Sequence, residues 1–330
     1  MKACVDLGGT KITVSLADES RPGNREGGPP VLIARRSEAT VKTGASDAIA
    51  LQIQRMLAEA CAAQGISVDA LQAIGVSSCG PFLLQDGCIA LVGPNICGGI
   101  AGPARGLPND WTSAPLEAPL RQRYGERLQL ENDGIGALQA ERRWGALQGF
   151  DHCAYMTWST GIGFGLCVDG RVLRGKNGNA GHAGHMFVSD WPLVDTLSAE
   201  PIPLCGCGNV GDIEGLVSGN AIARRFAHAG YADALALLLA AQSGKDSQAQ
   251  ALVDELCRVL GRALYNLVVT LDLQRISIGG SVFWHNQGYL LPRLQKALTG
   301  KIPALTEGCL LVPAGLGEQV GDFGALALVS

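Results

Sequence analysis

The sequence contains no block of basic residues and no long apolar run. Its formal net charge is −4 at pH 7, so a nucleic-acid partner has no electrostatic basis. The longest apolar runs, such as Ala234 to Ala241, are far shorter than the roughly 18 residues that cross a bilayer. Charged residues are also few, at 17%, whereas 47% of residues are hydrophobic, which excludes a disordered chain. We therefore expect a folded protein that binds neither nucleic acid nor a membrane.

We expect no signal peptide, because a strand-like segment begins at Ala3. The eleven cysteines are an odd number and are scattered along the chain. Reduced thiols in a cytosol are the simplest interpretation of this pattern. We expect a cytoplasmic protein.

Glycine is abundant, with 45 residues in 330, about twice the usual share of roughly 7%. Two strand, glycine-turn, strand units lie about 150 residues apart and resemble a weak internal repeat. The first runs from Cys4 through Leu7–Lys11 to Ala17, and the second runs from Cys153 through Ser159–Gly165 to Val168. Glycine turns can direct backbone N–H groups at phosphate oxygens. A glycine hairpin alone often only turns the chain, so each loop by itself is weak evidence.

The remaining pattern alternates strands with helices and predicts an α/β fold. Helical spacing of apolar residues marks the longer helices, and short buried runs mark the strands. We expect helices at Ser46–Gly65, Asn109–Tyr124 (after a loop), Ile135–Leu147, Asn220–Gln242, Gln248–Leu271 and from about Val320, with further strands at Leu71–Ser77, Leu128–Glu131, Arg275–Ile278 and Leu310–Pro313.

One segment matches the dinucleotide-binding motif in its residues but lacks the structural context that the motif requires. The segment Gly206–Gly211 fits G-x-G-x-x-G, but it follows Pro201-Ile202-Pro203 rather than a hydrophobic strand. The second glycine loop follows a strand but leads into another strand rather than a helix. Neither segment supports a Rossmann dehydrogenase.

Seven motifs, in one order along most of the chain, together resemble the ROK (repressor, open reading frame, kinase) family. They are Asp6–Lys11; Glu131-Asn132-Asp133 with Ala137 and Glu141; Thr157–Gly165; Asp169-Gly170 with Arg174-Gly175 through Gly181; Cys205–Gly208 with Gly211, Glu214 and Ser218-Gly219; Ile278–Gly280; and Gly321–Ala325. The last two resemble the family's adenosine-side segments. Only their combination makes the signal specific.

The resemblance implies a two-lobed actin-like ATPase (RNase H-like) fold in which ATP and a sugar meet in an inter-domain cleft, and it implies a homodimer. We expect an N-terminal lobe of residues 1–131 plus 316–330 with the first phosphate motif and part of the sugar site. Residues 132–315 would form a C-terminal lobe with the catalytic aspartate, the second phosphate loop, the zinc-like segment and the adenosine side. Family repressors carry an additional N-terminal DNA-binding domain, and a first motif at residue 6 favours a kinase.

The resemblance also implies roles for single residues. Asp133 would be the general base and Asp6 would hold Mg²⁺ through water. The nucleotide and phosphate residues would be Asp6, Gly8, Gly9, Thr10, Lys11, Thr160, Gly161, Gly163, Gly279 and Gly280. The sugar residues would be Gly80, Asn95, Asn132, Asp133, His182, His185 and Glu214. On the residues alone, a turn with a helix N-cap is the favoured interpretation of Asn132-Asp133-Gly134.

Three positions depart from the family pattern. His182 stands where the family usually has glutamate, which puts the choice of sugar in doubt. Asp212 takes the place of a third zinc cysteine, leaving His185, Cys205, Cys207 and Asp212 as ligands for a structural Zn²⁺ or as ordinary packing. Ser159 replaces a glycine beside the second phosphate loop.

We expect an ATP:sugar phosphotransferase acting on a hexose or an N-acetylhexosamine, with ATP and Mg²⁺ as cofactors. Zn²⁺ is a candidate structural ion. The spacing of 20 positions from His185 to Cys205 resembles the N-acetylglucosamine kinase branch more than many glucokinases, in which this spacing is shorter. The alternative is a catalytically weak sugar-binding regulator of the same fold. The intact Asp6, Lys11 and Asp133 argue against that alternative, whereas His182 and Asp212 argue for it.

Overall fold

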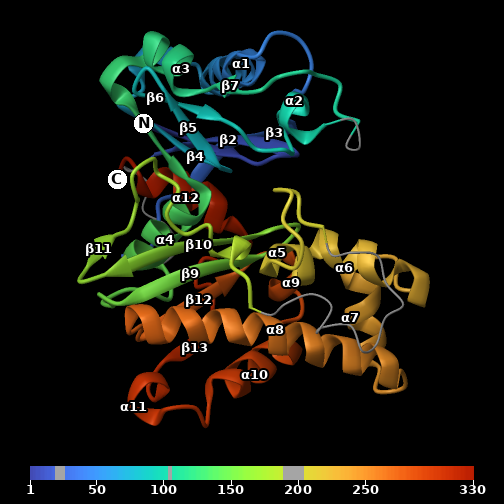
Figure 1. Cartoon of the computed structure of the whole chain (residues 1–330). Helices are drawn as coiled ribbons and strands as arrows, with labels where there is room; N and C mark the ends of the chain where they lie inside the picture. The colour runs from blue at the N-terminus through green and yellow to red at the C-terminus, as the bar shows by residue number, and fades with distance from the viewer. Residues whose placement is uncertain (19–26, 103–105, 189–203) are drawn as a thin grey trace. The chain divides into compact units, whose positions relative to one another are not determined.

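The computed structural model describes residues 1–18, 27–102, 106–188 and 204–330. Its contacts divide the chain into two compact units. The first comprises Met1–Gly145, Arg174–Ala180 and Gln319–Ser330, and the second comprises Ala146–Leu173 and Gly181–Glu318. Each unit is built around its own five-stranded sheet (Figure 1).

The sheet of the first unit has the strand order β3-β2-β1-β4-β8. Strand β2 pairs antiparallel with both β1 and β3, whereas β4 pairs parallel with both β1 and β8. The strands are β1 (Lys2–Leu7), β2 (Lys11–Ala17), β3 (Leu32–Ala39), β4 (Ala73–Ser78) and β8 (Leu128–Asn132). A smaller sheet contains β5 (Phe82–Gln85), β6 (Cys88–Leu91) and β7 (Ala114–Pro115). The helices of this unit are α1 (Ala48–Ala62), α2 (Gly98–Ala101), α3 (Glu117–Tyr124), α4 (Asp133–Trp144) and α12 (Val320–Ala327).

The two faces of this sheet differ in chemistry, because side chains alternate along each strand. One face carries Val5 and its apolar neighbours, and it packs against α1 in a fully buried core. The other face carries Cys4 and Asp6 from β1, together with the buried hydroxyls of Ser15 and Ser77. Polar groups in this interior are unusual, and they lie under α4 and α12.

Glycine allows α12 to approach this polar face closely. A Cβ at Gly75 of β4 would lie only 1.9 Å from the carbonyl oxygen of Ala325. Where α12 crosses α4, a Cβ at Gly324 would lie 3.1 Å from the backbone of Gly136 and Ala137. The C-terminal helix is therefore an integral layer of the first unit.

The sheet of the second unit repeats the order and directions of the first. Its order is β11-β10-β9-β12-β13, with β9, β10 and β11 antiparallel and β9, β12 and β13 parallel. The strands are β9 (Cys153–Trp158), β10 (Ile162–Val168), β11 (Arg171–Val172), β12 (Arg275–Gly279) and β13 (Leu310–Pro313). The internal repeat predicted from the two glycine turns is confirmed at the level of topology. The second turn is shorter than we expected, because β10 already begins at Ile162.

The core of the second unit lies between its sheet and helices led by the 25-residue α8, which Figure 1 shows in orange. The helices are α5 (Ile213–Val217), α6 (Gly219–Phe226), α7 (Ala234–Gln242), α8 (Ser247–Leu271), α9 (Ser281–Trp284), α10 (Gln287–Leu298) and α11 (Pro303–Thr306). The single helix expected at Asn220–Gln242 is wrong. Gly230 adopts a left-handed conformation with φ of 92°, and Asp233 caps a new helix, so α6 and α7 are separate.

The boundary expected after residue 131 differs from the observed division. Residues 132–145 form α4, which packs on α12 and on β4 and β8, so they belong to the first unit. The segment Arg174–Ala180 joins the same unit, because the side-chain amide of Asn179 forms two 2.8 Å hydrogen bonds with the backbone of Phe82. Asp133 therefore lies in the same unit as Asp6.

No helix in the described part of the chain combines the length and the apolar character needed to cross a membrane.

Candidate functional site

The first glycine loop is a tight hairpin between β1 and β2. The Gly8 amide donates to the Lys11 carbonyl at 2.9 Å, which closes the turn, and Thr10 and Lys11 are exposed. A Cβ on Gly9 would lie 3.3 Å from the Cβ of Asn95, so this predicted sugar residue lies against the loop. Gly80, the other predicted residue of this region, follows β4, and its carbonyl lies near Gly93.

Asp6 lies at the carboxyl end of β1 in an acidic environment. The pKa of its carboxyl is raised to about 7, mainly by burial and then by the negative charges of Asp322 and Asp133, against the opposing charges of Lys11 and Arg35. A Cβ at Gly321 would lie 2.7 Å from the Asp6 carboxylate, so only glycine fits at the start of α12. Carboxylates held together in this way favour a cation.

Sequence reasoning missed Asp322. It is 5% exposed, and its carboxylate accepts a 3.0 Å hydrogen bond from Arg35 Nε. The resemblance predicts an adenosine-side segment at Gly321–Ala325, and in the structure these residues lie in α12 against the first sheet. Asp6 and Asp322 are 316 residues apart in the chain, so no local spacing connects them.

The raised pKa of Asp6 predicts a pH-dependent stability of the nucleotide-free protein. The folded state holds the Asp6 proton up to about pH 7, whereas the unfolded chain releases it near pH 3.8. The stabilisation is therefore present below pH 4 and is lost as the pH rises towards 7. Asp6→Asn should raise Tm relative to wild type by several degrees at pH 8 and by little at pH 5, as measured calorimetrically with chelator present.

Asp86→Asn provides the control, because Asp86 is exposed and far from this cluster in the sequence. An Asp6→Asn effect on Tm that is the same at both pH values would contradict the raised pKa.

Asn132 and Asp133 lie at the start of α4 in different positions. Asn132 is the N-cap of α4, and its Oδ1 accepts from the Gly134 amide at 3.0 Å. Asp133 is the first residue of the helix, and its Oδ1 accepts from the same amide at 2.8 Å. The N-cap is thus supplied by Asn132, and the carboxylate of Asp133 lies at the carboxyl end of β8, close enough to Asp6 to raise its pKa.

The second glycine loop lies between β9 and β10 in the second unit. Its turn is Ser159–Gly161, in which the Ser159 amide donates to the Gly161 carbonyl at 3.0 Å. The Thr160 carbonyl accepts from the Asn220 amide at 3.3 Å. Ser159 occupies the turn without disrupting it, because its carbonyl accepts from the Gly219 amide at 2.8 Å.

Glu214, which we predicted as a sugar contact, touches this loop. Its Oε2 accepts from the Ile162 amide at 2.9 Å and would lie 2.8 Å from a Cβ on Gly161. Its Oε1 lies 3.6 Å from the Cys205 thiol. Glu214 therefore connects the loop with the cysteine segment.

Gly279 and Gly280 close the end of β12 beside β9. A Cβ on Gly280 would lie 2.4 Å from the Trp158 carbonyl oxygen, and φ of Gly280 is 90°. A Cβ on Gly279 would lie 2.6 Å from the Tyr155 hydroxyl. Both glycines are thus required at the carboxyl ends of these strands, the edge at which the second loop also begins.

Gly163 gives the cleaner test of phosphate binding. A Cβ there would make only an ordinary 3.5 Å contact with Thr157 Cγ2, and β10 suits a β-branched residue. Gly163→Val should therefore fold with an unchanged Tm but bind nucleotide at least 10-fold more weakly in calorimetry, because its methyl groups exclude phosphate. Unaltered ATP affinity would make the loop an ordinary turn.

Four candidate metal ligands converge in the second unit. One ligand atom from each of His185, Cys205, Cys207 and Asp212 lies within 4.8 Å of the others. The Asp212 Oδ2 lies 3.0 Å from His185 Nδ1 and 3.3 Å from Cys207 Sγ, and Cys205 Sγ lies 3.6 Å from His185 Nδ1. Tetrahedral zinc with bonds of about 2.0–2.3 Å separates its ligands by roughly 3.3–3.8 Å. The two distances that involve sulfur lie in this range and the Asp212–His185 distance is shorter, so the donor types suit zinc and the carboxylate and imidazole would move slightly apart around it.

The hairpin that resembles a dinucleotide fingerprint carries two of these ligands, Cys205 and Cys207. Leu204 and Val210 pair as an isolated bridge, and Gly208 turns the chain with φ of 95°. Residues 201–203, which precede the hairpin, lie outside the described residues. Burial raises the pKa of the Cys205 thiol, and a bound cation would reverse that effect.

His182 lies next to this cluster. Its ring stacks on that of His185, with centroids 6.2 Å apart and planes at 18°. Gly181 and Gly184 bring the segment against β10, where a Cβ on either residue would lie 2.2 Å from a strand carbonyl oxygen. The neighbours of His182 are thus fixed by close packing.

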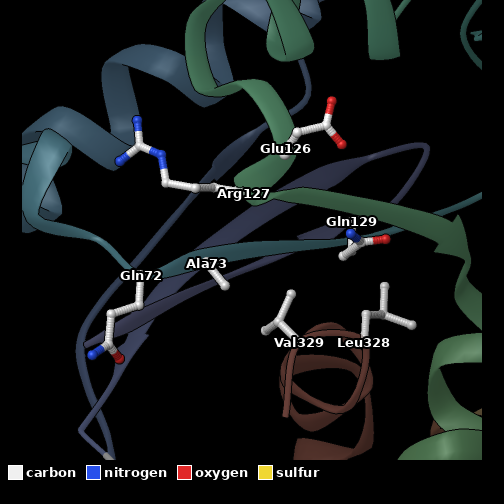
Figure 2. A pocket seen from close by; sticks show the side chains of 7 residues that line it. All are labelled: Gln72, Ala73, Glu126, Arg127, Gln129, Leu328 and Val329. Carbon is white, nitrogen blue, oxygen red and sulfur yellow. The ribbon is translucent and has the colours of Figure 1, made fainter.

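A separate hollow of about 450 Å³ lies in the first unit, at the amino ends of β4 and β8 (Figure 2). Its lining comprises Gln72, Ala73, Glu126, Arg127, Gln129, Leu328 and Val329. No predicted site residue lines it. Because Asp6 and Asp133 lie at the opposite, carboxyl ends of the strands, this hollow is distinct from the candidate site.

Comparison with known proteins places these features in context. The model of the ROK family matches residues 2–330. The N-acetylmannosamine kinase of Escherichia coli O157:H7 is 30% identical over 84% of this chain and 82% of its own length.

Two solved structures are similar over nearly the whole chain. The ROK hexokinase from Thermus thermophilus is 30% identical with a TM-score of 0.70, covering 99% of this chain and 97% of its own. A ROK family glucokinase from Streptomyces griseus, solved with glucose and AMPPNP, is 26% identical with a TM-score of 0.68. The match covers 98% of this chain and 97% of the glucokinase chain. With the repeated strand order of the two sheets, this likeness confirms the two-lobed actin-like ATPase fold.

Proposed function

This chain is a member of the ROK family, and from that membership we propose that it is an ATP-dependent kinase of a hexose or an N-acetylhexosamine. The observation that carries the proposal is the position of Asp133. Its carboxylate follows β8, is not the cap of α4, and interacts with Asp6 beside the first glycine loop. The kinases similar to this chain are named as a glucokinase, an N-acetylmannosamine kinase and a hexokinase.

Phosphoryl transfer requires positioning, charge neutralisation and removal of the acceptor proton. We assign Asp133 as the base that takes the proton from the sugar hydroxyl. The glycine loops would offer backbone N–H groups to the phosphates, and Lys11 would add a positive charge. Mg²⁺ would neutralise charge on the phosphates, and Asp6 would hold it through water, in keeping with the reluctance of this ion to dehydrate.

Sugar recognition would rest on side chains, and at Gly80 on the backbone, that offer directional partners to hydroxyls. We propose Gly80, Asn95, Asn132, Asp133, His182, His185 and Glu214 for this role. The contact of Asn95 with Gly9 and of Glu214 with Ile162 supports it, because both lie beside the glycine loops. His185, Cys205, Cys207 and Asp212 would hold a structural Zn²⁺.

An ATP-turnover assay against a panel of hexoses and N-acetylhexosamines tests the function. We expect saturable ADP release with at least one sugar and none without Mg²⁺. The panel also separates the alternative, a sugar-binding regulator, which is favoured by His182 and Asp212. A sugar that raises Tm without any turnover would establish that alternative.

We expect His182 to set sugar preference. A hydrogen bond to a charged group contributes about 1.5–3 kcal/mol, or roughly 10–100-fold in discrimination. His182→Glu should therefore shift kcat/KM towards glucose by at least 10-fold relative to the best substrate of the wild type. Equal kcat/KM ratios across the panel for both proteins would mean that His182 only packs.

We also propose that the protein is a cytoplasmic homodimer. Light scattering of the purified protein tests its mass.

A further inference from the structure

Thr40 forms two hydrogen bonds with the first glycine loop, although it lies 29 positions after Lys11 in the sequence. Its hydroxyl donates to the Gly8 carbonyl at 2.8 Å, and its amide donates to the Thr10 carbonyl at 3.0 Å. Thr40 is 5% exposed and directly follows β3. The motifs in the sequence did not single it out.

These two bonds fix the direction of two peptide planes. In a trans peptide, the C=O of one residue and the N–H of the next point in opposite directions. Because the carbonyls of Gly8 and Thr10 point towards Thr40, the amides of Gly9 and Lys11 point away from it. A loop that binds an anion needs this separation, since a carbonyl oxygen on the ligand side would repel phosphate.

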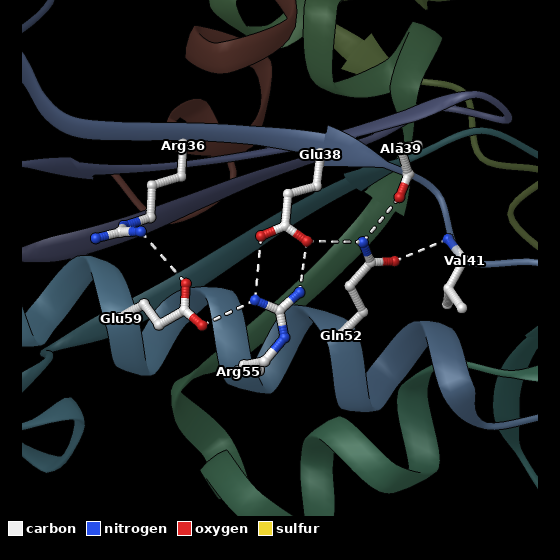
Figure 3. Close-up of polar contacts among 7 residues, drawn as sticks. All are labelled: Arg36, Glu38, Ala39, Val41, Gln52, Arg55 and Glu59. Atoms are coloured by element: carbon white, nitrogen blue, oxygen red, sulfur yellow. Dashed lines mark hydrogen bonds and ion pairs between the residues drawn. The ribbon is translucent and has the colours of Figure 1, made fainter.

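Gln52 of α1 holds the segment around Thr40 from the other side (Figure 3). Its Nε2 donates to the Ala39 carbonyl at 2.8 Å, and its Oε1 accepts from the Val41 amide at 2.9 Å. The side-chain amide therefore binds the residues immediately before and after Thr40. The backbone at Thr40 cannot shift without breaking bonds to α1 or to the loop.

The ion pairs around Gln52 are a poorer explanation for this rigidity. Arg55 bridges Glu38 and Glu59, and all three side chains are at least 37% exposed (Figure 3). Exposed pairs contribute about 0–1 kcal/mol. The buried hydroxyl of Thr40 and the amide of Gln52 carry the connection to the loop.

We propose that Thr40 is a positioning residue for nucleotide binding, supported by Gln52, which presents the amides of the first glycine loop to the phosphates. The proposal rests on the proposed kinase function. It adds two residues, neither of which would touch the nucleotide, to those that determine affinity for it.

Thr40→Val tests the hydroxyl, because valine keeps the shape and removes the donor. Kd for the Mg²⁺ complex of the β,γ-imido analogue of ATP, measured by calorimetry without sugar, should rise about 10-fold, the effect of one buried hydrogen bond. Thr40→Ser keeps the donor and should stay within 2-fold of wild type. Gln52→Leu should weaken binding by about 3-fold or more, whereas Glu59→Gln, which changes only the exposed pairs, should not.

Hydrogen exchange of the nucleotide-free protein provides a readout that does not depend on catalysis. Amides of the peptide spanning residues 4–12 should exchange faster in Thr40→Val and at the wild-type rate in Thr40→Ser. Unchanged exchange and unchanged Kd in Thr40→Val would overturn the positioning role, as would a serine variant as weak as the valine variant. A wild type that binds no nucleotide would instead refute the kinase function, while the exchange result would still decide the role of Thr40.

Discussion

Asp133→Asn is expected to lower kcat by about 10²-fold or more, because general base catalysis contributes typically about 10²–10⁴-fold. An amide can still accept hydrogen bonds from a sugar hydroxyl, but it cannot take its proton. KM for the sugar should therefore change much less than kcat. Steady-state kinetics with the best substrate of the panel measures both.

The structure makes this variant a clean test. The cap of α4 comes from Asn132, so the helix keeps its N-terminal hydrogen bond when Asp133 is replaced. Glu126→Gln, an exposed change just before β8, is the matched control for removing a carboxylate and should retain wild-type kcat. Near wild-type kcat in Asp133→Asn would remove Asp133 from the mechanism.

Local sequence was sufficient where the chain forms a site with its own neighbours. The first glycine loop lies where its sequence predicts it, between two strands of a hairpin. The Asn132-Asp133 segment was ambiguous in sequence because both residues can cap a helix. The hydrogen bonds separate their roles, since Asn132 precedes the helix and Asp133 begins it.

Contacts between distant segments were beyond sequence reasoning. Asp322 approaches Asp6 only because Gly75 and Gly321 let α12 pack directly on the sheet. Thr40 meets the loop only because β3 pairs with β2. In both cases the signal is a close approach in three dimensions, which neither periodicity nor motif spacing records.

The domain boundary differed for a similar reason. We expected the second lobe to begin at residue 132, but the helix that follows β8, α4, packs back on the same sheet, through Gly136 and Ser77. The direction of that packing depends on α12, the last helix of the chain.

Replacing Cys207 by serine is expected to remove zinc from the protein, from about one ion per chain to nearly none in elemental analysis. A cysteine thiolate binds zinc, whereas the hydroxyl of the serine that replaces it is a poor zinc ligand. Zinc that binds only the folded state stabilises that state by about 2.7 kcal/mol when free metal is 100-fold above Kd. Tm should therefore fall by several degrees, as it should in wild type treated with a strong chelator. Cys88→Ser, in β6 of the other unit, should keep both zinc and Tm.

Asp212→Asn distinguishes a metal ligand from a structural carboxylate. Asp212 is fully buried, and its Oδ1 caps α5 by accepting from the Gly215 amide at 2.7 Å, while its Oδ2 faces His185 and Cys207. Asparagine is an equally good cap but lacks the charge that zinc requires. If the cluster binds zinc, Asp212→Asn should weaken metal binding at least 10-fold, and added zinc should no longer raise its Tm as it raises that of metal-stripped wild type. If freshly purified wild type contains no zinc and its Tm does not respond to added zinc, the cluster is a hydrogen-bonded cap in which Asp212 binds His185 directly.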